Sequence, residues 1–140
     1  MFLKKILIFV PGFIWLIISL WLFTLPGTAI PKFDLFTKLQ GDKLIHAIIF
    51  IVLCISFLLP LHNIQPYCAN NKFWFLFIIL VFGMYGLAIE FVQEKFIKFR
   101  SFDVGDIVAD WVGCFIGFKL FIRYWIKKIG LSRNRDRNQN

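Results

Sequence analysis

Polar residues that can hold a charge or a proton interrupt the apolar second half of this sequence at regular intervals. Glu90 and Gln93 close one apolar segment, and Asp106 and Asp110 open the next one. Residues three or four positions apart share one face of a helix, so each pair predicts one polar face. A carboxylate inside an apolar, lipid-facing segment is costly unless it faces a partner or a cavity. We therefore expect these residues to point inward and to meet one another.

Further polar residues stand where the preceding apolar segment begins and in the loop before Asp106. Asp42 and His46 are four positions apart and share a face if a helix begins that early. The candidate cluster, for ligand binding or for structural pairing, therefore consists of Asp42, Lys43, His46, Glu90, Gln93, Arg100, Ser101, Asp103, Asp106 and Asp110. Two interpretations stay open: the cluster binds a ligand, or Glu90 and Asp110 pair with Arg100 or His46 and lock the helices together.

Several carboxylates with one histidine have the composition of a divalent-metal site or of a general acid and base. The motifs HExxH and GxSxG and a Cys-His arrangement do not occur in the sequence. Cys54, Cys68 and Cys114 are not spaced as a disulfide framework or a thiolate zinc site, and we expect Cys54 and Cys114 to be packing residues of apolar segments. We therefore assign no catalytic residue, no metal ligand and no cofactor.

The composition predicts an integral membrane protein. Of the 140 residues 59% are hydrophobic, and the mean hydropathy is +0.75, which is unusual for a soluble domain of this size. The net charge of +8 suggests nucleic-acid binding at first sight. The basic residues, however, stand at the ends of apolar segments rather than on one polar face, so we expect no nucleic-acid partner.

Four apolar segments, of about residues 6–25, 44–61, 73–93 and 106–126, each have roughly the 20 residues that a membrane-crossing helix needs. They predict an all-α, integral membrane four-helix bundle formed by residues 1–126. The first segment is longer than the apolar part of a signal peptide, so we expect it to be retained. A short interfacial helix is expected near residues 33–39. The basic tail 127–140 has no apolar face and is predicted to be disordered.

The distribution of Lys and Arg predicts the orientation of the four segments. More of these residues lie on the side shared by both termini, so we expect both termini to be cytoplasmic. The polar cluster then lies near the outer leaflet. Small residues at four-residue spacing let membrane helices approach closely. We expect Gly86, Gly113 and Gly117 to bring segments 73–93 and 106–126 together, with Arg100 above their carboxylates.

At these residues the chain resembles the VanZ-like family of small bacterial membrane proteins. The matching pieces are Asp42-Lys43-x-x-His46, Glu90-x-x-Gln93, Arg100-Ser101-x-Asp103-x-x-Asp106 and Asp110-x-x-Gly113-x-x-x-Gly117. The family often has Asn where this chain has Asp110, and an extra carboxylate at this position makes charge pairing more important. The resemblance implies a multi-pass protein of the bacterial cytoplasmic membrane and a connection with resistance to glycopeptide antibiotics such as teicoplanin.

The first functional hypothesis is a non-enzymatic protein of the cell envelope. Its polar cluster would bind a lipid-linked or glycopeptide-related molecule near the outer leaflet, so its partners would be the lipid bilayer and a lipid-linked envelope precursor. One alternative is a membrane-embedded hydrolase or transferase that acts on envelope lipids with a metal ion or carboxylates. Another is a small proton-coupled transporter, because Glu90 and Asp110 suit a proton relay. The sequence does not give the oligomeric state.

Overall fold

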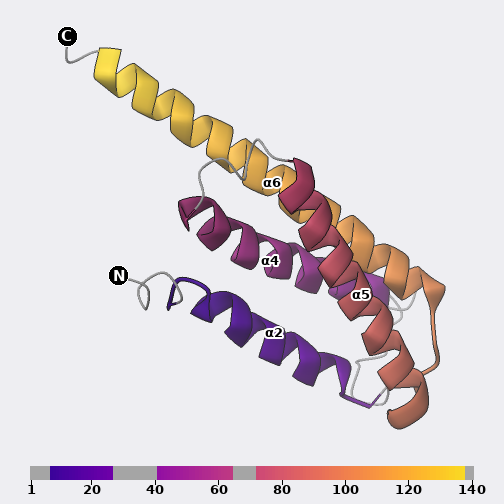
Figure 1. Cartoon of the computed structure of the whole chain (residues 1–140). Coiled ribbons are helices and arrows are strands. Elements are labelled where there is room, and N and C mark those ends of the chain that lie inside the picture. The colour runs from indigo at the N-terminus through magenta and orange to yellow at the C-terminus, as the bar shows by residue number, and fades with distance from the viewer. Residues whose placement is uncertain (1–6, 27–40, 65–71, 138–140) are drawn as a thin grey trace.

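The computed structural model describes residues 7–26, 41–64 and 72–137, and within these ranges it contains four helices and no strand. The helices are α2 (Val10–Phe23), α4 (Gly41–Ile64), α5 (Lys72–Phe96) and α6 (Val104–Arg137). Successive helices run in opposite directions, so the ends of α2 and α5 lie near the beginnings of α4 and α6 (Figure 1). The predicted all-α architecture with four helices is confirmed for this part of the chain.

The contact between α4 and α6 is the most extensive one between helices. Gly113 and Gly117 make it possible: a Cβ at Gly117 would lie 2.9 Å from the carbonyl oxygen of Ile51, and one at Gly113 would collide with that of Ala47. We expected this glycine ridge to meet residues 73–93, and that expectation is wrong, because the ridge faces α4. Spacing determines that two glycines share a face, but it does not determine which neighbour the face meets.

The centre of the bundle is packed from residues of these same helices. Phe50, Leu53, Cys54 and Cys114 are fully buried. Cys54 and Cys114 are free thiols, so the predicted packing role of these two residues is confirmed. Cys68 lies outside the described residues.

Two polar contacts tie α2 to α4 and α5. The indole N–H of Trp15 donates a hydrogen bond to the carbonyl oxygen of Ile49 at 3.1 Å, and the hydroxyl groups of Ser19 and Tyr85 are 2.9 Å apart. A hydrogen bond between groups shielded from water holds two helices in one register, because separating the groups would leave both unsatisfied. These contacts fix the position of α2 on the bundle.

The outward faces of the helices are apolar. Ile17 of α2 is 68% exposed, Leu76 of α5 is 65% exposed and Val108 of α6 is 56% exposed. Two segments, Gly41–Leu61 and Leu76–Phe96, are long and apolar enough to cross a membrane, although only 39% of the apolar window of each is buried inside the protein. The core helix of a soluble protein would be mostly buried, so these two helices differ from that pattern.

The other two helices match the expected spans less closely. The helix α2 has 14 residues, fewer than the predicted segment 6–25. The helix α6 has 34 residues, but Asp106, Asp110 and Lys119 interrupt its apolar part. The basic composition predicts disorder from residue 127, whereas α6 continues to Arg137, so that prediction is wrong for residues 127–137. Lys, Arg and Leu favour helices and no proline interrupts this stretch, so the helix propagates. The interfacial helix near residues 33–39 and the tail 138–140 lie outside the described residues.

The α4–α6 contact yields a stability prediction. Gly113→Leu would force a side chain against the backbone of Ala47 and separate the two helices. Overpacking of this kind costs about 1–3 kcal/mol, so we expect a lower melting temperature for the purified protein in detergent, measured by circular dichroism. Val112→Leu at the neighbouring, exposed position is the matched control and should melt like the wild type. Equal melting temperatures for Gly113→Leu and the control would contradict the close contact.

Candidate functional site

One end of the bundle, where α2 and α5 end and α4 and α6 begin, holds a set of interacting polar side chains that we call the polar layer. It consists of Asp42, Lys43 and His46 from α4, Glu90 and Gln93 from α5, Arg100 and Asp103 from the loop before α6, and Asp106 and Asp110 from α6. The helix α4 begins at Gly41, so Asp42 and His46 do share its first turns as their spacing requires. Nine of the ten predicted site residues are therefore brought to one level. Ser101 is exposed in the loop and does not join the buried groups.

The innermost pair of the polar layer joins α4 to α6. His46 Nδ1 lies 2.9 Å from Asp110 Oδ1, and both side chains are 1% exposed. An ionised carboxylate can only accept a hydrogen bond, so Nδ1 is the donor of this contact when Asp110 is ionised. A neutral His46 ring then has its lone pair on Nε2. The ring of Phe23 covers the imidazole at a centroid distance of 4.5 Å. The predicted pairing of Asp110 with His46 is thus confirmed.

Gly86 makes room for this pair. A Cβ at Gly86 would collide with Asp110 Oδ2, which is buried and has no hydrogen-bond partner. The sequence suggested that Gly86 brings two helices together. The structure shows which group requires the glycine: α5 must leave space at Gly86 for the Asp110 carboxylate of α6. A larger residue at this position would displace Asp110 from His46.

The rim of the polar layer contains its two permanent cations. The Lys43 ammonium group donates to Asp103 Oδ2 at 2.5 Å and to Asp106 Oδ1 at 3.3 Å. The Arg100 guanidinium donates from Nη1 to Asp42 Oδ2 at 2.6 Å. The sequence suggested Glu90, Asp106 or Asp110 as partners of Arg100, and the observed partner is instead Asp42. Helix spacing could not reveal this, because the direction of Arg100 depends on the loop between α5 and α6.

That loop is held by two features next to Arg100. Phe99 has a φ of 62°, which is uncommon for a residue with a side chain and reverses the chain after α5. Asp103 Oδ1 accepts a hydrogen bond from the N–H of Gly105 at 2.6 Å, and this contact caps the first turn of α6. The Lys43 ammonium, followed by the Gly105 N–H, lowers the pKa of Asp103 because both stabilise its ionised form.

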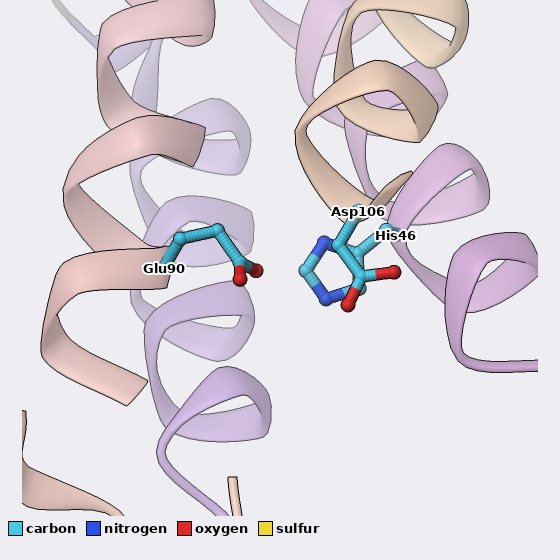
Figure 2. Close-up of side chains that lie close together, drawn as sticks. All are labelled: His46, Glu90 and Asp106. Carbon is cyan, nitrogen blue, oxygen red and sulfur yellow. The ribbon is translucent and has the colours of Figure 1, made fainter. Parts of the chain in front are cut away.

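The third buried carboxylate of the polar layer, Glu90, comes from α5. Its Oε2 accepts a hydrogen bond from the backbone N–H of Asp103 at 2.9 Å, whereas its Oε1 is buried without a partner. His46 Nε2 is also buried without a partner. Figure 2 shows the Glu90 carboxylate extending from α5 toward His46 and Asp106. One ligand atom from each of these three residues lies within 4.8 Å of the other two.

Gln93 has a structural role in the polar layer. Its side-chain amide donates a hydrogen bond to the backbone carbonyl of Phe23 at 2.9 Å, so it satisfies the last turn of α2.

The sequence did not point to Ser19 and Tyr85, whose hydroxyl pair lies deeper in the bundle. A serine inside an otherwise apolar helix was the available signal, since such a hydroxyl requires a partner.

The polar layer has an excess of negative charge. It combines five carboxylates, those of Asp42, Glu90, Asp103, Asp106 and Asp110, with only two permanent cations, Lys43 and Arg100. The excess is three charges when His46 is neutral and all five carboxyl groups are ionised. Glu90, Asp106 and Asp110 are also the most buried of the five, so the rim cations do not fully compensate them.

The role of Asp103 can be tested through pH. Asp103→Asn keeps an acceptor for the Gly105 N–H but loses the attraction to Lys43. Because the folded pKa of Asp103 is lowered, this attraction contributes stability above the unfolded pKa of about 3.9 and is lost as the pH falls below it.

We therefore expect Asp103→Asn to lower the free energy of unfolding at pH 7 by about 1 kcal/mol or less, because the pair is half-exposed. The melting temperature should fall slightly with it. The difference from the wild type should shrink as the pH falls through the folded pKa of Asp103, so it should be smaller at pH 3 than at pH 7. Asp103→Ala should be less stable than Asp103→Asn at both pH values, because it also removes the helix cap. A wild-type advantage over Asp103→Asn of the same size at pH 3 and pH 7 would contradict the assigned pairing.

Comparison with known proteins adds one relative. No protein-family model matches the chain, and no solved structure matches it. An uncharacterized protein of the fission yeast Schizosaccharomyces pombe is 35% identical over 122 residues, which cover 84% of this chain and 66% of the relative. The chain thus spans just under two thirds of the relative's length. Because this relative is uncharacterized, the VanZ-like interpretation stays a prediction that depends on the motif residues.

Proposed function

We propose that this chain is a VanZ-like, multi-pass protein of the bacterial cytoplasmic membrane whose polar layer binds a phosphate-bearing, lipid-linked molecule of the cell envelope near the outer leaflet. Both termini would lie in the cytoplasm, and the lipid bilayer and this molecule would be the partners. Through the VanZ-like resemblance, such binding would influence the sensitivity of the host to glycopeptides such as teicoplanin. No catalytic step is part of this proposal.

The distribution of polar and apolar side chains supports the membrane location. Large apolar residues such as Ile17, Leu76 and Val108 face outward, whereas His46 and Glu90 are buried. A soluble protein has the opposite arrangement, because exposed apolar area is unfavourable in water. In a bilayer this arrangement is favourable, since lipid solvates the apolar faces and the bundle shields the charged groups.

The environment of Arg100 is the observation that best supports a phosphate-bearing ligand. Its side chain is only 10% exposed, its Nη1 donates to Asp42, and its Nε is buried without a partner. A guanidinium presents its donors as a planar fork that matches the oxygens of a phosphate. A phosphate at the rim would satisfy the free Nε–H, and Lys43 of the same rim would add a second positive charge.

An apolar cavity supports the lipid part of the ligand. It has a volume of about 450 Å³ and lies between α2, α4 and α5, lined by Phe9, Phe13, Leu16, Phe57, Leu61, Phe77, Ile78, Val81, Phe82 and Tyr85. Val81 precedes Glu90 by nine positions, which is about 13 Å along a helix. An acyl chain is long enough to cover this distance when its headgroup is at the polar layer.

A second candidate function, a hydrolase or transferase acting on envelope lipids, is favoured by the His46–Asp110 pair. A histidine oriented by a carboxylate, with its second nitrogen free, is the arrangement of a general base. Release of phosphate from a lipid-linked phosphate substrate by purified protein, and its loss in His46→Gln, would distinguish this function from binding alone.

The orientation can be tested by cysteine labelling in whole cells. Ser101→Cys and Gln139→Cys would each be made in a Cys68→Ser chain that retains the buried Cys54 and Cys114. We expect a membrane-impermeant maleimide to label intact cells through position 101 but not position 139, because the loop would be outside and the C-terminus inside. Labelling at 139 and protection at 101 would show the opposite orientation.

The ligand can be tested by native mass spectrometry of the protein purified from the membrane. We expect phosphate-bearing lipid adducts on the wild type. For Arg100→Ala we expect the affinity for these lipids, and with it the adduct occupancy, to fall at least about tenfold, because a charge-assisted hydrogen bond contributes about this factor. Lys98→Ala removes a charge from the same loop at an exposed position and is the matched control.

A second variant separates ligand loss from structural damage. Arg100→Ala leaves Asp42 without its partner, so the double variant Arg100→Ala with Asp42→Asn restores the charge balance. The proposal expects the double variant to remain without adducts. Equal occupancy in Arg100→Ala and Lys98→Ala would contradict a site at Arg100.

A further inference from the structure

We propose that His46, Glu90 and Asp106 bind one divalent transition-metal ion, Zn²⁺ or Mn²⁺, on the buried side of the polar layer. The sequence gave no metal motif, and the three residues come from three different helices. This inference goes beyond lipid binding at Arg100 and does not depend on it.

Two buried atoms without hydrogen-bond partners face the space between these helices and support a ligand there. His46 is 1% exposed and Glu90 is 0% exposed. Water therefore does not reach His46 Nε2 and Glu90 Oε1, and neither atom has a hydrogen-bond partner in the protein. When Nε2 is unprotonated and Glu90 is ionised, both atoms present only lone pairs, so neither can satisfy the other. A cation between them would satisfy both at once.

The surroundings hold these two side chains in the orientation that metal ligands usually have. Asp110 accepts a hydrogen bond from His46 Nδ1 at 2.9 Å, which leaves the lone pair of a neutral ring on Nε2. Metal-binding histidines commonly have such a carboxylate on their second nitrogen. The backbone N–H of Asp103 holds Glu90 Oε2 in a similar way and leaves Oε1 free.

The distances require only a small adjustment. The three ligand atoms lie within 4.8 Å of one another. A metal ion with bonds of about 2.0–2.2 Å requires separations of about 3–4 Å between its ligand atoms. The proposal requires small side-chain rotations of Glu90 and Asp106 about the hydrogen bonds that they make to the Asp103 N–H and to Lys43. His46 keeps its place through Asp110.

Charge and ligand type favour a divalent transition metal. The excess of three negative charges in the polar layer falls to one when a divalent cation is bound. Mg²⁺ and Ca²⁺ prefer sites composed of oxygen atoms only, whereas an imidazole nitrogen suits Zn²⁺ and other transition metals. Three protein ligands also leave a coordination position open, as at catalytic zinc sites.

Isothermal titration calorimetry of the full chain in detergent tests the proposal. The protein carries Cys68→Ser to remove one competing thiol, is stripped with EDTA, and is titrated with Zn²⁺, Mn²⁺ or Mg²⁺. We expect one Zn²⁺ or Mn²⁺ per chain, with weaker binding of Mg²⁺. Glu90→Gln, which keeps the shape of the side chain, should weaken binding at least tenfold. Glu94→Gln is the matched control, because it makes the same substitution at an exposed position of the same helix.

Two outcomes would overturn the metal site. One is the absence of stoichiometric Zn²⁺ or Mn²⁺ binding to a wild-type protein that is monodisperse and helical. The other is an equal affinity in Glu90→Gln and Glu94→Gln, which would show that Glu90 is not a ligand of the metal. X-ray absorption of the zinc-loaded protein provides a second measurement: the proposal expects one imidazole with oxygen ligands, and sulfur ligands would contradict it.

Discussion

The hydrogen bond between His46 and Asp110 is the interaction on which the rest of the polar layer depends. It joins α4 to α6 where both side chains are 1% exposed, so breaking it would leave buried polar groups unsatisfied. It forms only because Gly113 lets the two helices approach and because Gly86 leaves space for the second oxygen of Asp110. The glycines and the polar residues of this end of the chain therefore form a single structural unit.

This pair also determines what the neighbouring groups can do. With its Nδ1 engaged by Asp110, His46 presents Nε2 toward Glu90 and Asp106, and all three are buried. The two permanent cations remain at the rim, where Lys43 and Arg100 bond to carboxylates. The layer is thus divided into a buried part suited to a cation and a rim suited to an anion. A metal ion and a phosphate-bearing lipid would occupy different places in it.

Helical spacing predicted much of this arrangement, and its errors have a common cause. Asp42 and His46 were expected on one helix face and Asp106 and Asp110 on another, and the first turns of α4 and α6 do contain them. The structure joins the two helices through His46 with Asp110 and Lys43 with Asp106. The partner of Arg100, the helix that meets Gly117 and the group that faces Gly86 were not predictable. Those features depend on how each helix is rotated about its axis and on the path of the loop around Phe99, which residue spacing alone does not determine. Sequence reasoning did not single out the proposed metal ligands His46, Glu90 and Asp106, because they come from three helices and match no local motif.

The protonation of the His46 ring tests the central claim most directly. Nitrogen-15 NMR of the metal-free protein at neutral pH distinguishes a protonated from an unprotonated ring nitrogen, and a His62→Gln variant assigns the signals, since His46 is then the remaining histidine of the chain. The account predicts a protonated Nδ1, hydrogen-bonded to Asp110, and an unprotonated Nε2. A ring protonated on Nε2 alone, with an unprotonated Nδ1, would contradict both the hydrogen bond from Nδ1 to Asp110 and the use of Nε2 as a ligand.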